Sequence, residues 1–225
     1  MVEEGMQRDR FHRELEALKN RLLDLAELAK KALGQSISAF KERNPDLARQ
    51  VITGDKAIND LEVIIDGDCV QLVALHQPVA VDLRIIMAVD HIIAEIERVG
   101  DMAVNMAEEA LALTRYPSQP LHSQILLMAR KVQEMLMQSL EAFITRDVPL
   151  ARQVCLADDE VDALDQAIIQ DLLESMASHQ EIVPSDQSQI NIVRNLERVG
   201  DHATNIAEQV IYMVEGENVR HRCQE

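Results

Sequence analysis

Aromatic residues are scarce in this chain of 225 residues: Phe, Tyr and Trp together make up 2%, and there is no tryptophan. This disfavours a nucleic-acid-binding protein that stacks bases on aromatic rings. With seven glycines and six prolines, the chain also has few of the turn residues that an all-β fold needs. Because 47% of the residues are hydrophobic, Leu, Ile, Val, Ala and Met must fill the core, which suits packed helices.

Positive charge is also scarce, since 22 Lys and Arg residues face 39 Asp and Glu residues and give a net charge of −17. Phosphate backbones and anionic lipids are therefore unfavourable partners, whereas cations or a basic protein are favourable ones. No apolar run reaches the roughly 18–20 residues that cross a bilayer. The start of the chain, MVEEGMQRDR, does not resemble a signal peptide, so we expect a soluble, cytoplasmic protein. The three cysteines are odd in number and far apart, which predicts neither a disulfide framework nor a zinc motif.

Apolar residues recur at alternating steps of three and four, which is typical of one face of a helix. The pattern predicts a helix from about Asp9 to about Arg43, a second from near Pro45 to near residues 76–78, and a third whose buried stripe includes Gly100. The stretch YPSQP at 116–120 interrupts the pattern and is the best candidate for a domain boundary. Long helices with short connections favour antiparallel bundles.

The chain then repeats itself. QSISAFKERNPDLARQV at 35–51 matches QSLEAFITRDVPLARQV at 138–154, and IERVGDMAVNMAEEA at 96–110 matches LERVGDHATNIAEQV at 196–210. A tandem duplication explains both matches. We therefore predict an all-α fold of two tandem three-helix bundles, with six long antiparallel helices, divided into residues 1–116 and 117–225.

The pentapeptide ERVGD occurs at both 97–101 and 197–201. It places Glu97 one helical turn from Asp101, and Glu197 one turn from Asp201, on a polar stripe outside the core. Carboxylates at this spacing repel by a few tenths of a kcal/mol, and the glycine inside the helix costs about 1 kcal/mol relative to alanine. For the glycines we expect close approach of a neighbouring helix. The predicted stripes continue through Asn105 and Glu108, and through Asn205 and Glu208.

A second set of acidic residues lies at helical spacing on the preceding helix of each repeat. The first repeat has Asp55, Asn59, Glu62 and Asp66, and the second has Asp158, Asp162 and Asp165. If the two helices are neighbours, the carboxylates repel unless protons or cations intervene. Oxygen ligands suit Mg²⁺, Mn²⁺ or Ca²⁺, and also iron in carboxylate-bridged clusters. The alternative is a solvated acidic face without metal.

The histidines do not strengthen the metal hypothesis. A ferritin-like di-iron centre needs Glu-x-x-His on paired helices, whereas the spacing here is Glu-x-x-x-Asp. His202, beside Asp201, is more typical of a surface residue than of a ligand. His76 and His179 recur at the ends of predicted helices, where an imidazole cap is the favoured role.

The sequence resembles the PhoU family of bacterial phosphate-transport regulators. The resemblance rests on the duplicated ERVGDxAxNxAE helices, the segment LHQPVAVDLR at 75–84 and the order of six helices. It implies two three-helix bundles with multinuclear metal clusters on their surface. The residues implied to bind metal are Glu97, Asp101, Glu197, Asp201, Asp158, Asp162 and Asp55. Asn59 takes the place of a carboxylate in the first repeat, and the identity of the metal (iron, zinc, magnesium, manganese or calcium) stays open.

The resemblance also implies a function. It predicts a non-enzymatic negative regulator of the phosphate regulon and of phosphate uptake, an adaptor between the ATPase subunit of a phosphate ABC transporter and a phosphate-sensing histidine kinase. We further expect a homodimer, at most peripheral at the inner membrane through its partners, without membrane insertion and without nucleic acid. Two alternatives remain at this point: a carboxylate-bound metalloenzyme, for which no nucleophile or histidine base is evident, and a plain helical scaffold.

Overall fold

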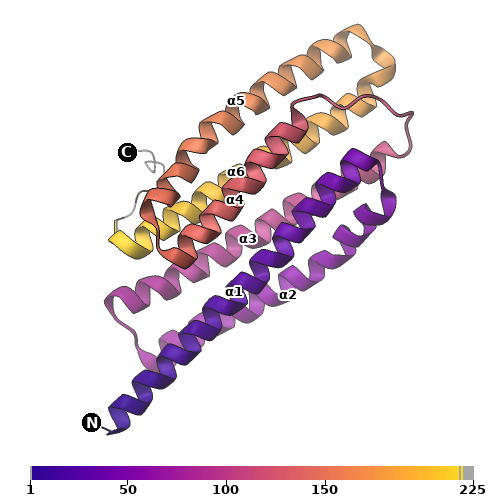
Figure 1. Cartoon of the computed structure of the whole chain (residues 1–225). Coiled ribbons are helices and arrows are strands. Elements are labelled where there is room, and N and C mark those ends of the chain that lie inside the picture. The colour runs from indigo at the N-terminus through magenta and orange to yellow at the C-terminus, as the bar shows by residue number, and fades with distance from the viewer. Residues whose placement is uncertain (1, 218, 220–225) are drawn as a thin grey trace.

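The computed structural model describes residues 2–217 and residue 219, and six α-helices account for nearly all of them. The first three are α1 (Val2–Glu42), α2 (Pro45–His76) and α3 (Ala80–Leu113). The last three are α4 (Ile125–Thr145), α5 (Val148–Ser178) and α6 (Val183–Glu215), and a 3₁₀ turn, η1 (Gln180–Ile182), precedes α6. Figure 1 shows each set of three as an antiparallel bundle, with the two bundles side by side. The predicted fold class is confirmed. The described residues contain no helix that is both long enough and apolar enough to span a bilayer.

Local signals in the sequence set most of the helix boundaries. Asn44 caps α2 by accepting hydrogen bonds from the backbone amides of Asp46 and Leu47, at 3.0 and 3.2 Å, and Pro45 occupies the first turn. In the second repeat, Asp147 Oδ1 accepts from the backbone amide of Leu150 at 3.0 Å. The capping residues are thus duplicated with the rest of the sequence. The predicted start of the first helix near Asp9 was wrong, because α1 begins at Val2.

The polar composition of the first turns of α1 explains that error. Residues 2–8, VEEGMQR, carry little of the apolar periodicity on which the prediction relied. They are helical nevertheless because a helix, once nucleated by a packed segment, propagates at low cost. The packed segment follows directly, since Phe11, Leu15, Leu18 and Leu22 are all buried.

The core lies along the stripes that the sequence predicted. Ile96, Gly100 and Ala103 of α3 are buried, as are their counterparts Leu196, Gly200 and Ala203 of α6. Helices α3 and α6 also pack more extensively against each other than any other pair of described helices. They therefore form the centre of the molecule, and each has one side turned to its own bundle and another turned to the other repeat. The predicted boundary at 116–120 falls in the connection between α3 and α4.

Candidate functional site

The two motif glycines let the second helix of each repeat approach the third. A Cβ atom at Gly100 would lie 3.0 Å from Ile58 Cδ1 and 3.5 Å from Asp55 Oδ1. A Cβ atom at Gly200 would lie 3.4 Å from Asp158 Oδ1. The small residues therefore do allow close helix packing, as predicted. They also bring Asp55 and Asp158 against the backbone of the ERVGD segments.

Asp158 is the most perturbed carboxyl group of the second repeat. Its side chain is half-buried, and its Oδ1 atom has no hydrogen-bond partner. Burial raises the pKa of Asp158 to about 7, and the neighbouring charges of Asp201, Asp162 and Glu197 add to the effect. The ionised form is disfavoured both by loss of water and by repulsion between like charges.

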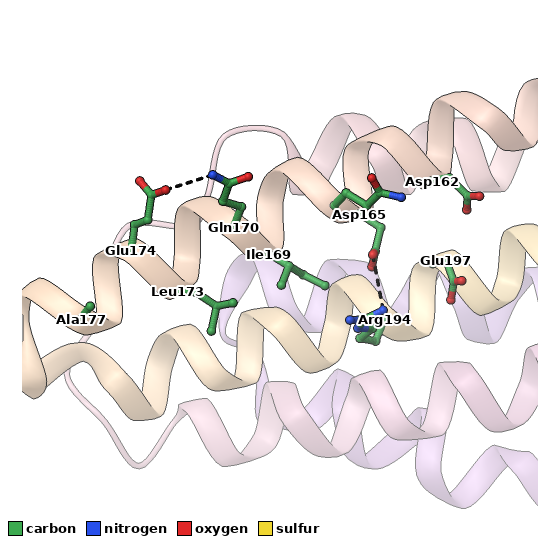
Figure 2. A pocket seen from close by; sticks show the side chains of 10 residues that line it. Asp162, Asp165, Ile169, Gln170, Leu173, Glu174, Ala177, Arg194 and Glu197 are labelled. Carbon is green, nitrogen blue, oxygen red and sulfur yellow. Dashed lines mark hydrogen bonds and ion pairs between the residues drawn. The ribbon is translucent and has the colours of Figure 1, made fainter.

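The other carboxylates of this cluster show the same influence. Burial raises the pKa of Glu197, and Asp201, Asp165 and Asp162 raise it further. The pKa of Asp201 is also raised, by burial and then by Asp162. Figure 2 shows Asp162 and Asp165 on α5 opposite Glu197 on α6. The structure thus brings together the acidic residues of α5 and α6, which the sequence placed at helical spacing on two successive helices.

The first repeat carries a weaker version of the cluster. Burial, followed by Asp101 and Glu62, raises the pKa of Glu97, and burial followed by Asp55 raises the pKa of Asp101. Asn59 replaces a carboxylate in this cluster, and its Nδ2 atom donates a hydrogen bond to Asp55 Oδ2 at 2.9 Å. One oxygen of Asp55 is therefore satisfied within the protein, while the other, Oδ1, has no partner.

Two asparagines predicted to extend the acidic stripes instead face the other repeat. Asn105 Nδ2 donates to Asn195 Oδ1 at 3.2 Å, and Asn205 Nδ2 donates to Glu95 Oε2 at 3.0 Å. Each step of four residues turns 40° around the helix axis, so two such steps carry the stripe from the acidic face to the α3–α6 interface.

Sequence reasoning missed Glu95 and misjudged His202. His202 Nδ1 lies 2.7 Å from Glu95 Oε2, and its side chain is only 15% exposed. Although burial opposes it, the hydrogen bonds from His202 and Asn205 lower the pKa of Glu95. His76 is not a backbone cap either, because its Nε2 atom pairs with Glu14 Oε2 at 2.7 Å. The sequence marks Glu95 in one way only: the equivalent residue of the second repeat is Asn195, so the two repeats differ at this position.

The clusters offer the chemistry that a hard cation needs. Their donors are carboxylate oxygens, and Asp55 and Asp158 each keep a buried oxygen without a hydrogen-bond partner. A cation would satisfy such an oxygen and relieve the repulsion around it. Within the described residues, however, no three His, Cys, Asp or Glu side chains are already arranged to hold a metal ion. Metal binding at the seven predicted residues therefore stays a prediction.

Comparison with protein families gives a match to the PhoU domain twice, at residues 22–110 and 125–210. The chain belongs to the PhoU family. The two matches cover most of both bundles, so the family assignment includes the duplication.

Curated relatives agree with this assignment. The chain is 34% identical over 211 residues to the phosphate-specific transport system accessory protein PhoU of Escherichia coli K12, a match that covers 94% of this chain and 88% of the relative. It is 36% identical over 213 residues to the PhoU homolog of Aquifex aeolicus, which covers 95% and 96% of the two chains.

Two solved structures have the same fold. A crystal structure of PhoU from Pseudomonas aeruginosa matches with a TM-score of 0.89 and 34% sequence identity, over 92% of this chain and 100% of that one. The phosphate transport system regulatory protein PhoU from Streptococcus pneumoniae matches with a TM-score of 0.87 and 28% identity, over 93% and 99%. Because the family consists of accessory and regulatory proteins, the prediction that the chain is not an enzyme is confirmed.

Proposed function

We propose that this protein is a negative regulator of phosphate uptake and of the genes for phosphate starvation, and that it acts by docking to protein partners. Membership of the PhoU family supports a role accessory to phosphate transport. The partners proposed are the ATPase subunit of a phosphate ABC transporter and a phosphate-sensing histidine kinase. These partners would place the protein in the cytoplasm, peripheral to the inner membrane, and we propose that it works there as a homodimer.

The structural observation that supports the proposal is the carboxylate cluster around Asp158, whose half-buried side chain keeps an oxygen without a hydrogen-bond partner. A half-buried carboxyl group whose pKa is raised to about 7 is costly to keep ionised, and no hydrogen bond to its Oδ1 offsets the cost. Such groups cluster at functional sites more often than in ordinary surfaces. The duplication places a related group, Asp55, at the same position in the first repeat.

A metal ion bound to the carboxylates would supply positive charge to this face. Glu197, Asp201, Asp158 and Asp162 would hold it in the second repeat, and Glu97, Asp101 and Asp55 in the first. The face formed by α2 and α3, or by α5 and α6, then differs in charge between the metal-free and metal-bound protein. Charge complementarity governs the encounter with partners and rejects wrong ones, so the metal content would set which partners dock.

A genetic experiment tests the regulatory role. Deletion of the gene should leave phosphate-starvation genes expressed when phosphate is abundant, and the wild-type gene should restore repression. The double variant Glu197→Ala, Asp201→Ala should restore it only partly at equal protein level. Glu134→Ala with Glu141→Ala is the matched control, because both residues are exposed on α4 and should not affect repression. Normal repression in the deletion strain would reject the regulatory role.

Calorimetric titration with Mg²⁺, Mn²⁺, Zn²⁺ and Fe²⁺ tests the metal sites separately. Asp201→Asn should weaken binding at the second repeat, and Asp101→Asn should weaken binding at the first. The second repeat should bind more tightly, because it offers Asp162 where the first offers Asn59. Equal and weak binding by wild type and both variants would favour a solvated acidic face and a plain helical scaffold.

A further inference from the structure

A groove of about 630 Å³ runs between α5 and α6 of the second repeat. Figure 2 shows Ile169 and Leu173 of α5 directed toward α6, and the α5 residues on the wall of the groove extend from Asp162 to Ala177. At 1.5 Å per residue this stretch spans about 22 Å, roughly four helical turns. The groove is therefore long and open rather than a closed pocket for a small molecule.

Away from the predicted metal residues, a row of apolar side chains runs along the wall of the groove, beside Gln170 and Glu174. Ile169, Leu173 and Ala177 line it at spacings of four residues, and the Leu173 side chain is 53% exposed. Repeating apolar side chains along one edge of a helix pair form the kind of surface on which an amphipathic helix places its own apolar face.

The remaining lining residues give the groove a negative charge. Asp162, Asp165, Glu174 and Glu197 contribute carboxylates, and Arg194 is the one Lys or Arg residue among the lining residues that the structure describes. The Asp165 side chain is 8% exposed, and its Oδ1 atom has no hydrogen-bond partner. Its other oxygen, Oδ2, lies 3.5 Å from Arg194 Nη1, which is beyond a close ion-pair contact.

The first repeat does not reproduce this combination, although the sequence there is homologous. Counting back 103 residues from α5, Ile169 falls on Asp66, Gln170 on Gly67 and Leu173 on Val70. The apolar wall is therefore interrupted by a carboxylate in the first repeat. The row that Ile169 and Leu173 form on α5 is therefore not repeated on α2, where Asp66 and Val70 hold these positions.

We propose that the α5–α6 groove binds one amphipathic helix of a protein partner, with apolar side chains against Ile169 and Leu173 and with Lys or Arg side chains toward Asp165 and Glu174. A second copy of this chain is a poor occupant of this acidic groove, because each copy carries a net charge of −17, and the proposed homodimer would form through another surface. The proposal names the surface on which a partner docks and the type of helix that the partner presents. Its biological meaning rests on the docking role proposed above. Binding in the groove, however, can be measured without it.

The test uses a synthetic helical peptide of about 18 residues, labelled with fluorescein, that has leucines along one face and lysines beside them. Fluorescence anisotropy is measured with the full-length protein in EDTA, so that metal plays no part. We expect binding that weakens with added salt. Leu173→Arg should weaken it about ten-fold or more, because the substitution places charge and bulk on the apolar wall.

Val70→Arg is the matched control. Val70 holds the equivalent position in the first repeat and is 63% exposed, so the same charge is added to the same protein without blocking the groove. Its effect on peptide binding should stay within about two-fold. Hydrogen exchange should show protection by the peptide at residues 166–177 and 190–197.

The proposal would be overturned by no binding at low salt, by equal weakening from Leu173→Arg and Val70→Arg, by equal binding of a peptide with glutamates in place of the lysines, or by protection confined to another surface. Loss of a dimer in Leu173→Arg, measured by light scattering, would assign the groove to a second copy and also overturn it. Failure here would leave the genetic test of phosphate regulation unaffected. Failure of that test would leave peptide binding unaffected, so the two proposals can fail independently.

Discussion

Asn59 donates a hydrogen bond to Asp55 at 2.9 Å, whereas the equivalent residue of the second repeat, Asp162, has no proton to donate to Asp158 when ionised. The equivalent residues Asp55 and Asp158 therefore have different neighbours. In the first repeat an amide hydrogen bond satisfies one oxygen of Asp55, and in the second repeat Asp158 and Asp162 place two like charges on adjacent turns of α5. A difference of one side chain, Asn59 against Asp162, makes the second repeat the stronger candidate for binding a cation.

Replacing each of these two side chains by the other should change the free energy of unfolding in opposite directions. In EDTA at pH 8, Asp162→Asn should raise the free energy of unfolding by about 1 kcal/mol, because the amide can donate to Asp158 and one negative charge is removed. Asn59→Asp should lower it by a similar amount for the opposite reason. Urea denaturation measures both changes. Destabilisation by Asp162→Asn would show that the side chain does not repel Asp158.

The raised pKa of Asp158 predicts a dependence of stability on pH. With a pKa of about 7 in the folded protein and an ordinary value near 3.8 when unfolded, the folded state holds the proton more tightly. Stability should therefore fall as pH rises from about 4 to about 7, and stay low above that. Asp158→Asn should remove this part of the decline, with a gain of at least about 1 kcal/mol at pH 8 in EDTA. Parallel pH profiles of the variant and the wild type would contradict the assignment.

The two motif glycines should respond differently to alanine. Alanine favours a helix by about 1 kcal/mol over glycine. At Gly200 the new methyl group would meet Asp158 and Val161 at 3.4 Å, which is ordinary contact, so Gly200→Ala should stabilise the protein. At Gly100 it would meet Ile58 Cδ1 at 3.0 Å, and the shift required of Ile58 should cancel much of the gain. Thermal unfolding compares the two, and a more stable Gly100→Ala would contradict this packing argument.

The link between the repeats should depend on Glu95. Glu95→Ala removes the acceptor for His202 and Asn205, and we expect a loss of about 2 kcal/mol because partly buried donors are left unpaired. Glu108→Ala on the same helix is the control, since its side chain is exposed and its loss should cost under about 0.5 kcal/mol. Because the pKa of Glu95 is lowered on folding, the contribution of Glu95 is present above its ordinary pKa and should disappear as pH falls below that range. Equal losses from the two variants would remove Glu95 from the interface.

The sequence by itself determined the six helices, their duplication and the rows of acidic residues on the second and third helix of each repeat. These features depend on short-range information: apolar spacing of three and four, capping residues such as Asn44 and Asp147, and proline-containing connections. The capping interactions join residues two or three positions apart, so they can be predicted from the sequence alone. The start of α1 was misplaced because its polar first residues continue a helix that is nucleated by the packed residues after them.

Only the tertiary structure decided which polar faces meet. The rotation of α3 against α6 turns Asn205 and His202 toward Glu95 instead of the acidic clusters, and that rotation is set by packing over the whole core. Burial likewise gives Asp158 its raised pKa, and the charges of Asp201 and Glu197 reach it only because α5 and α6 pack together. The α5–α6 groove has the same origin, because its walls come from residues 17 to 35 positions apart, whose side chains converge only when the two helices pack.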